Sequence, residues 1–315
     1  MAELFVCPLC GGGLTRQAGS LRCPAGHCFD MAREGYTYLL PVNRRHSKSP
    51  GDDKAMAAAR SAFLGKGWYA PLRDALCKLS VSLTGDAPAV LDTGCGEGYY
   101  TAGVYHALLD AGKAPTVAGT DISKPILRLA AKREKSIQFA VASSYRLPVA
   151  DTSIDLLLNC FSPLALEEFR RVLRPGGHFL YVVPGPEHLW EMKQVLYDAP
   201  YPNEDKETPY EGFRYVTILP VEAMLHLADP ADIQALFAMT PYYWKTPVLK
   251  DYVNSMSWIA ASSSASTCLK RSEQNALHRT VCQSPGREEQ HAGPTGHMAG
   301  SMASGRTRGP GVLPL

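Results

Sequence analysis

The chain has 315 residues, of which 45% are hydrophobic and 20% charged. This composition supports a large globular core and excludes a chain that is disordered throughout. The formal net charge of +2 makes bulk attraction to nucleic acid weak, so any such affinity must come from local patches. The sequence has no run of eighteen apolar residues and no signal-peptide pattern at its start. We therefore expect a soluble cytoplasmic protein without a membrane contact.

Metal-ligand spacing stands near the beginning of the chain. Cys7 and Cys10 form a C-x2-C pair, and Cys23 and His27 follow twelve residues later as C-x3-H. Two short loops that each bring two soft ligands to one point predict a tetrahedral, structural zinc site. In so small a module, metal binding would contribute on the order of 10 kcal/mol to folding. Cys28 is a rival for the fourth position, and four protein ligands leave no open position for catalysis.

The middle of the chain alternates strands with helices. Apolar runs of strand length occupy residues 88–92, 115–121, 137–143, 154–160 and 178–184. Helical stretches are predicted for residues 99–111, 124–133 and 164–173. This alternation predicts an α/β fold of Rossmann type, with right-handed crossovers and a mainly parallel sheet. Ligands of such a sheet bind at the carboxyl ends of its strands.

A glycine-rich run, DTGCGEG, follows the first of these strands and opens a helix, and it contains Asp92, Gly94, Gly96 and Glu97. Asp121 ends the next strand, where a carboxylate can accept hydrogen bonds from ribose hydroxyls. The order G-x-G-x-G differs from the dinucleotide fingerprint G-x-G-x-x-G. It resembles the first motif of class I S-adenosylmethionine-dependent methyltransferases. The alternative is a nucleotide-free α/β domain with a tight turn.

A closer resemblance rests on seven motifs in order: CPLC, CPAGHCFDMAREGYTYLLP, PGDDKAMAAARSAFL, GWYAPLRDAL, VLDTGCGEGYYT, SSYRLP and PGPEHL. Over roughly residues 5–250 they resemble the bacterial 23S rRNA (guanine-N1) methyltransferases, which modify a hairpin loop and include housekeeping and macrolide-resistance members. The resemblance implies S-adenosylmethionine and zinc as cofactors, 23S rRNA as partner, and a homodimer. It also implies zinc at the four ligands above and cofactor contacts from Tyr69, Gly96, Glu97 and His188.

These assignments have plainer alternatives. Tyr69 lies among apolar residues and would also suit a core position, and His188 would also suit a surface helix cap. The basic residues at 44–48, RRHSK, would suit either a solvated linker or phosphate contacts.

The expected domain organisation has four parts. They are a zinc-binding RNA-recognition module at 1–40, a basic connector and helix at 41–66, a methyltransferase domain at 67–258, and an atypical tail at 259–315. Class I methyltransferases usually close their sheet with an antiparallel pair of strands. Here SSSASTCLKRSEQNALHRTV stands in place of an aromatic and β-branched run, and the tail has no aromatic residue. We therefore expect a disordered tail, one or two missing strands and an exposed sheet edge.

Methyl transfer from a sulfonium chiefly requires that the acceptor be placed in line with the methyl group. Guanine N1 must also lose its proton, and the sequence assigns no catalytic residue to that step. Phe161, after the fourth strand, is a candidate to stack on a flipped-out base. Two rival functions are a small-molecule methyltransferase and a catalytically impaired RNA-binding or ribosome-assembly factor. The zinc module argues against the first, and the intact glycine loop against the second.

Overall fold

The computed structural model describes residues 3–41, 50–204, 207–245 and 258–271. Within these ranges no helix is long and apolar enough to cross a membrane. The basic residues at 44–48 lie outside the described ranges, as does the tail after residue 271.

A small antiparallel sheet forms the N-terminal module. Its strands are β1 (Thr15–Gln17), β2 (Ser20–Arg22) and β3 (Cys28–Asp30), in the order β1-β2-β3. The β1–β2 turn consists of Ala18 and Gly19, whose φ angles of 41° and 84° are the left-handed values that a two-residue hairpin turn requires. The sequence thus places a glycine at one of the two strained positions.

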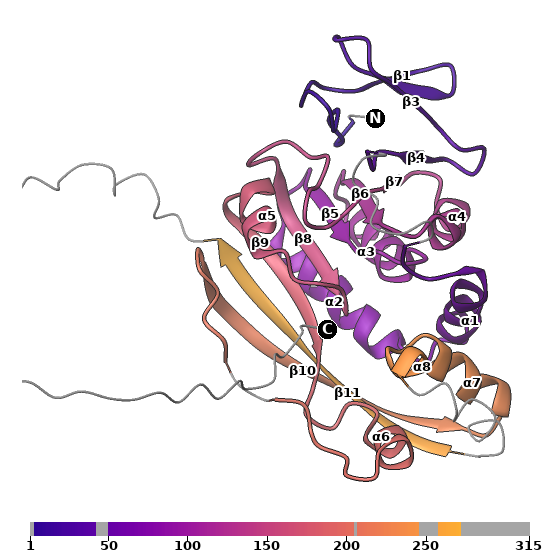
Figure 1. The fold of residues 1–315 in the computed structure, drawn as a ribbon. Coiled ribbons are helices and arrows are strands. Elements are labelled where there is room, and N and C mark those ends of the chain that lie inside the picture. Colours follow the sequence, from indigo (N-terminus) through magenta and orange to yellow (C-terminus); the bar gives the residue numbers. More distant parts are fainter. Residues whose placement is uncertain (1–2, 42–49, 205–206, 246–257, 272–315) are drawn as a thin grey trace, which may run out of the picture. The chain divides into compact units, whose positions relative to one another are not determined.

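The large sheet has eight strands in the order β10-β11-β9-β8-β5-β6-β7-β4 (Figure 1). Strands β4 to β9 pair in parallel, and β11 runs antiparallel to both β9 and β10. The five predicted strands are confirmed as β5 to β9, and the mainly parallel sheet is confirmed with them. The strands span β4 Tyr36–Tyr38, β5 Ala89–Thr93, β6 Thr116–Asp121, β7 Gln138–Val141, β8 Ile154–Cys160, β9 Leu173–Pro184, β10 Phe213–Leu227 and β11 Trp258–Arg271.

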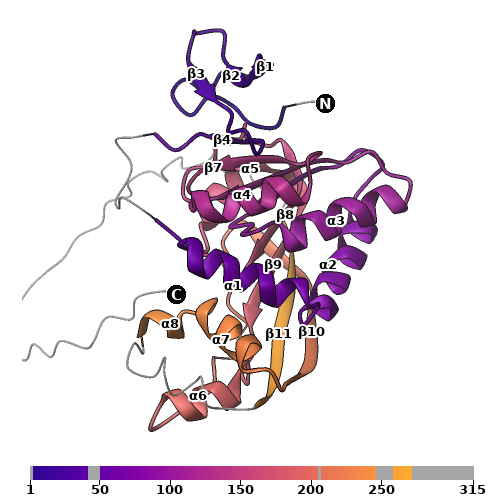
Figure 2. The same ribbon diagram turned by 90° about the vertical axis from the view of Figure 1, so that its right-hand side faces the viewer.

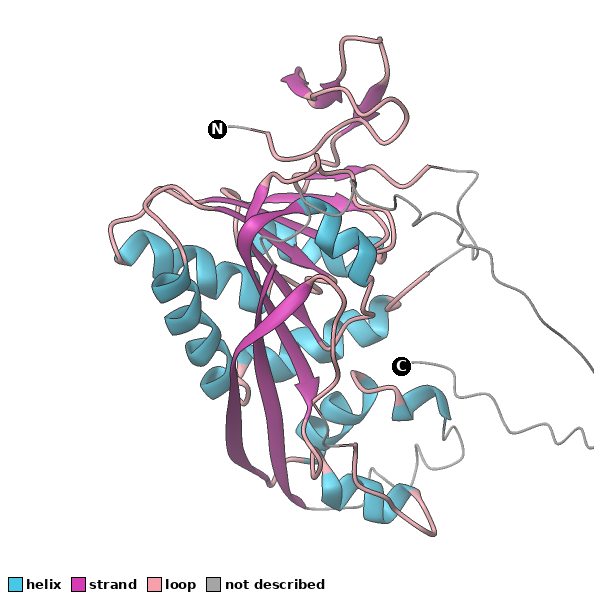
Figure 3. Cartoon of the chain, turned by 90° about the vertical axis from the view of Figure 1, so that its left-hand side faces the viewer, coloured by secondary structure: helices cyan, strands magenta, loops and turns pink. Residues whose placement is uncertain are grey.

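Helices flank the strands (Figures 2 and 3). The three predicted helices are confirmed as α3, α4 and α5. Side chains cap two helix starts: Asp53 accepts from the Met56 N–H at the start of α1, and Ser123 accepts from the Ile126 N–H at the start of α4. Such caps satisfy N–H groups that have no partner within the helix. The helices span α1 Lys54–Gly65, α2 Ala70–Leu83, α3 Tyr99–Asp110, α4 Lys124–Arg133, α5 Leu166–Val172, α6 Trp190–Leu196, α7 Pro230–Ala238 and α8 Tyr242–Lys245.

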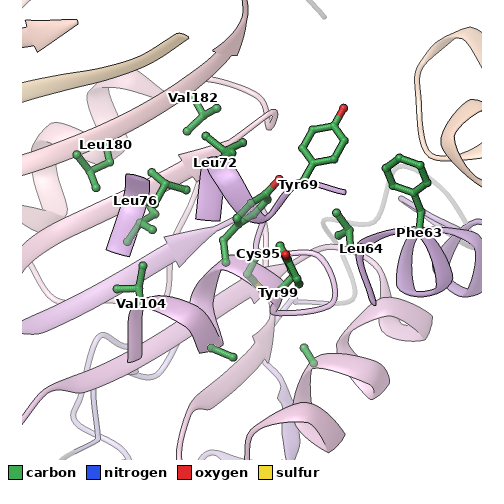
Figure 4. Packing of buried hydrophobic residues seen from close by; sticks show 14 of the residues in the cluster. Phe63, Leu64, Tyr69, Leu72, Leu76, Cys95, Tyr99, Val104, Leu180 and Val182 are labelled. Atoms are coloured by element: carbon green, nitrogen blue, oxygen red, sulfur yellow. The ribbon is translucent and has the colours of Figure 1, made fainter. Parts of the chain in front are cut away.

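The sheet buries both faces, because successive strand residues belong to different core clusters. Val90 packs in a cluster with residues of helices α1 to α4, whereas its neighbour Leu91 packs in a cluster with residues of α5 and the N-terminal module. Figure 4 shows part of the first cluster, around Tyr69 and Leu72. Burial on both faces explains why these strands read as continuous apolar runs rather than alternating ones.

The N-terminal module is built into the larger domain. Phe5, Leu14, Leu21 and Leu39 are buried in the second cluster, and the Val6 N–H donates to the Pro148 carbonyl at 2.8 Å. Strand β4 pairs in parallel with β7 and so extends the large sheet. This strand lies inside the 1–40 range expected for the zinc module, so the two expected domains share one sheet.

The expectation of missing closing strands is wrong for residues 258–271. These residues form β11, which inserts between β9 and β10 and supplies the antiparallel member of the closing pair. The expectation rested on side-chain composition. A strand between two others gains main-chain hydrogen bonds on both edges, which do not depend on side-chain identity.

We predict that Leu39→Ala lowers the free energy of unfolding of the whole described domain by about 2–5 kcal/mol, because it empties a site in the shared core. Leu39 is 2% exposed. Urea denaturation followed by far-ultraviolet circular dichroism measures the change. Leu9→Ala, at a side chain 58% exposed, is the matched control. A separate early transition with an unshifted main transition would show instead that the module unfolds alone.

Candidate cofactor site and zinc centre

Four ligand atoms of the N-terminal module converge on one point. One atom each of Cys7, Cys10, Cys23 and His27 lies within 4.8 Å of all the others. The Cys10 and Cys23 sulfurs are 3.7 Å apart, and His27 Nδ1 is 3.3 Å from the Cys23 sulfur and 3.5 Å from the Cys7 sulfur. A tetrahedral zinc with ordinary Zn–S and Zn–N bonds requires about 3.8 Å between sulfurs and about 3.5 Å between sulfur and nitrogen. The four residues therefore fit a structural zinc ion.

Cys28, the rival fourth ligand, lies outside this cluster. It is exposed and begins β3, where it pairs with Arg22 of β2. His27 therefore completes the site, and the strand that starts at the next residue carries the Cys28 thiol away from it.

The glycine-rich loop between β5 and α3 depends on left-handed backbone conformations. Gly94, Gly96 and Gly98 have φ angles of 72°, 56° and 76°. The N–H groups of Gly94 and Cys95 both donate to the Thr120 carbonyl, at 2.8 and 3.0 Å. The loop is thus fastened to the end of β6. Its glycines let the main chain turn at the carboxyl end of β5, as close approach to a ligand requires.

Two carboxylates border this loop. Asp92 is 1% exposed and its Oδ2 accepts a hydrogen bond from Thr101 at 2.6 Å. Burial raises the pKa of Asp92 to about 7, against a smaller lowering by Thr101. Asp121 Oδ2 accepts from the Gly96 N–H at 3.0 Å, and its Oδ1 accepts from the Ser123 N–H at 2.8 Å. Burial also raises the pKa of Asp121, and these two backbone hydrogen bonds oppose that effect.

Buried polar atoms without partners gather at the same edge of the sheet. Among the described residues, Asp92 Oδ1, Thr120 Oγ1 and Asn159 Oδ1 have no hydrogen-bond partner. Asp92 lies near the carboxyl end of β5, Thr120 near that of β6 and Asn159 near that of β8, and both β6 and β8 are neighbours of β5 in the sheet. Buried acceptors are normally satisfied, so these three atoms are polar positions left open at the strand ends, where the ligand of such a sheet binds.

Glu97, a predicted cofactor contact, is buried and paired with an arginine of α4. It is 1% exposed, and its Oε1 pairs with the Arg133 guanidinium at 2.7 Å. Arg133 also donates to the Glu97 carbonyl at 3.3 Å. These contacts tie the glycine loop to α4. Its Oε2 has no partner among the described residues, and its role as a cofactor contact stays a prediction.

Three aromatic rings meet beside the loop. Phe161, after β8, lies edge-on to Tyr69 at 6.4 Å between ring centroids and stacks on His188 at 5.6 Å. The Phe161 ring thus lies in contact with both Tyr69 and His188, the two aromatic residues predicted to contact the cofactor. Tyr69 is 5% exposed and packs in the first core cluster (Figure 4), which both interpretations of this residue allow. Cofactor contact by Tyr69 and His188 stays a prediction.

The contacts of residues 50–53 with the turn after Asp121 were not predicted from the sequence. The Asp52 carbonyl accepts a hydrogen bond from Ser123 Oγ at 2.6 Å, and its carboxylate pairs with Arg60 at 3.0 Å. A Cβ at Gly51 would lie 2.9 Å from the Ile122 and Ser123 side chains. The PGDD segment therefore packs tightly on the turn that follows Asp121. Gly51 in the sequence is a weak indication that the main chain approaches another segment closely. No sequence pattern identifies the turn after Asp121 as that segment.

Comparison with known proteins gives two family-model matches. Residues 5–48 match the zinc-ribbon model described as "RlmA, N-terminal", and residues 90–177 match the model described as "Methyltransferase domain".

Three curated relatives share substantial identity with the chain. A Bacillus subtilis protein, provisionally named a 23S rRNA (guanine-N(1)-)-methyltransferase, is 35% identical over 80% of this chain and 90% of its own length. A Micromonospora griseorubida protein with the same provisional name is 41% identical over 60% of this chain and 68% of its own. The 23S rRNA (guanine(748)-N(1))-methyltransferase of Streptomyces fradiae is 40% identical over 60% and 66%, respectively.

We predict that the purified chain holds one zinc ion and that His27→Ala loses it, because three ligands no longer close the tetrahedron. Cys28→Ser should keep the metal, since that thiol lies outside the cluster. Atomic absorption after gel filtration, with thiols reduced, measures zinc per chain. Less than half an equivalent in the unmodified protein would contradict the prediction.

A second prediction concerns pH. The raised pKa of Asp92 means that the folded protein keeps this proton where the unfolded chain has lost it. The Asp92 carboxyl therefore favours the folded state at low pH. Its contribution to the free energy of unfolding is lost as pH rises from about 4 through about 7. Asp92→Asn, neutral throughout, should gain in melting temperature over the unmodified protein between about pH 5 and about pH 8. Asp110→Asn, at an exposed carboxyl, is the control. An advantage that does not grow with pH would contradict the prediction.

Proposed function

Because this chain belongs to the family of 23S rRNA (guanine-N1) methyltransferases, we propose that it transfers a methyl group from S-adenosylmethionine to N1 of a guanine in a hairpin loop of 23S rRNA. The observation that carries the proposal is the joining of a zinc-ribbon module to the methyltransferase sheet through β4. A methyltransferase for small molecules has no need of such a module. The proposal includes a homodimer and, since its substrate is ribosomal RNA, a cytoplasmic location.

The cofactor, when bound, supplies an electrophilic methyl group. The main chain at Gly94 and Gly96 would lie against it, and Asp121 would accept from the ribose hydroxyls. Both Asp121 oxygens already accept a backbone N–H, which fixes the carboxylate, and each keeps a further lone pair for a ligand. Asp92, Glu97, Tyr69 and His188 complete the proposed set of cofactor contacts. Residues 67–258 would supply this chemistry.

Phe161 is the side chain best placed to hold the target base. Its φ of 52° is costly for a non-glycine residue, and such strain concentrates at functional positions. The side chain is 41% exposed. Stacking on this ring would orient a guanine that has left its helix.

Asn159 has a fixed orientation near this ring. Its Nδ2 donates to the Thr93 and Pro163 carbonyls, both at 3.3 Å. The amide is therefore oriented with Oδ1 as the remaining acceptor. A donor on the base or the cofactor would satisfy that oxygen. Positioning of this kind carries most of the rate in methyl transfer.

The proposal predicts that the full chain methylates a 23S rRNA fragment that contains the target hairpin loop. With labelled cofactor, primer extension should stop at one guanine of the loop, because N1 methylation blocks base pairing. Asp121→Ala should weaken cofactor binding by about 10- to 150-fold, as loss of hydrogen bonds to a charged group does. Asp110→Ala, at an exposed carboxyl, is the matched control. Tight cofactor binding with no label in any rRNA fragment would contradict the proposal.

A further inference from the structure

The SSYRLP motif at residues 143–148 has no role in the site described so far. It forms the turn after β7, at the carboxyl edge of the sheet. Tyr145, in the middle of this turn, is 65% exposed, and Arg146 beside it is exposed as well. Single exposed apolar side chains are common on protein surfaces, so exposure by itself indicates nothing. Two further features distinguish this turn: it is held firmly, and it lies between two functional parts of the chain.

The turn is closed by its own hydrogen bonds. The Arg146 N–H donates to the Ser143 carbonyl at 3.0 Å, and the Tyr145 N–H donates to Ser143 Oγ at 3.3 Å. The backbone that follows is clamped by α5. Glu168 accepts from the Leu147 N–H at 2.6 Å, and Arg171 donates to the Leu147 carbonyl at 3.0 Å. The Tyr145 ring is therefore presented to solvent by a rigid support.

The turn lies between the cofactor loop and the zinc module. On one side, Ser144 Oγ accepts from Thr93 Oγ1 at 2.7 Å, and Thr93 directly precedes the glycine loop. On the other side, Pro148 accepts from the Val6 N–H of the zinc module, and Val149 pairs with Phe5. A molecule that contacts both the zinc module and the methyl-transfer site would therefore pass close to this turn.

Arg146 differs from its arginine neighbours in the methyltransferase domain. Arg128, Arg170, Arg171 and Arg174 each pair with a carboxylate. Arg146 forms no ion pair with any residue that the structure describes. On the zinc module, exposed Arg22 likewise forms no ion pair within the described ranges, whereas Arg16 and Arg33 interact electrostatically with Glu3 and Glu34. Unpaired guanidinium groups therefore occur on both sides of the junction, as phosphate contacts require.

We propose that the Tyr145–Arg146 turn is an RNA-binding element that stacks an unpaired nucleotide next to the target guanine. Tyr145 provides the ring face for the base, and Arg146 contacts an adjoining phosphate. An exposed aromatic residue beside an unpaired arginine is the combination by which proteins hold single-stranded RNA. This inference rests on the proposed function and adds to it the part of the protein that holds the RNA loop outside the methyl-transfer site.

The test uses the full, zinc-loaded chain and the same hairpin fragment. Tyr145→Ala should raise KM for the RNA by about tenfold, as loss of one stacked base does, with kcat and cofactor affinity by calorimetry unchanged. Tyr145→Phe should behave as the unmodified protein, because it keeps the ring. Arg146→Ala should lower the slope of log KM against log salt by about 0.7–0.9. Tyr201→Ala, at a ring 69% exposed, is the matched control.

Three outcomes would overturn the inference. An unchanged KM for Tyr145→Ala, while the unmodified protein methylates the hairpin, would remove this inference alone. A comparable loss of cofactor affinity in Tyr145→Ala would assign the ring to the cofactor instead. If the unmodified protein binds cofactor and methylates no rRNA fragment, the proposed function fails and this inference fails with it.

Discussion

The position of β5 in the sheet is the constraint on which the site depends. Strands β6 and β7 extend the sheet on one side of β5, and β8 and β9 extend it on the other. The loops that leave neighbouring strands at such a reversal run to opposite sides, so the loop after β5 has room beside it for a ligand. The glycine loop, Asp121 and the unpartnered atoms of Asp92 and Asn159 all lie at this edge because the parallel strands end there together.

Burial on both faces of the sheet explains how the zinc module is attached. One face is covered by residues of helices α1 to α4, and the other combines α5 with Phe5, Leu14, Leu21 and Leu39. The module therefore fills a place in the core as well as carrying a metal. Its position next to the SSYRLP turn follows from this packing, since Val6 bonds to the last residue of that motif.

Strain and unsatisfied polar groups occur where the protein would meet its ligands. Phe161 has an unfavourable backbone conformation and an exposed ring, while Asp92 and Asn159 each keep one buried oxygen without a partner among the described residues. Such features lower the stability of the free protein. By contrast, the buried Glu97 is neutralised by Arg133, which holds the loop's shape.

The sequence by itself determined the elements and the ligands that depend on short-range spacing. The zinc ligands are close in sequence, and the glycine loop is one continuous run, so local spacing was enough to predict both. Strands β5 to β9 follow from apolar runs of strand length. Only the tertiary structure decided what depends on distant partners. Asp52 packs against Ser123, β4 joins the methyltransferase sheet, and Glu97 pairs with Arg133. Residues 258–271 form a strand although their composition argued against one. They pair with β9 on one edge and with β10 on the other. These hydrogen bonds join main-chain groups, so the sequence does not reveal them.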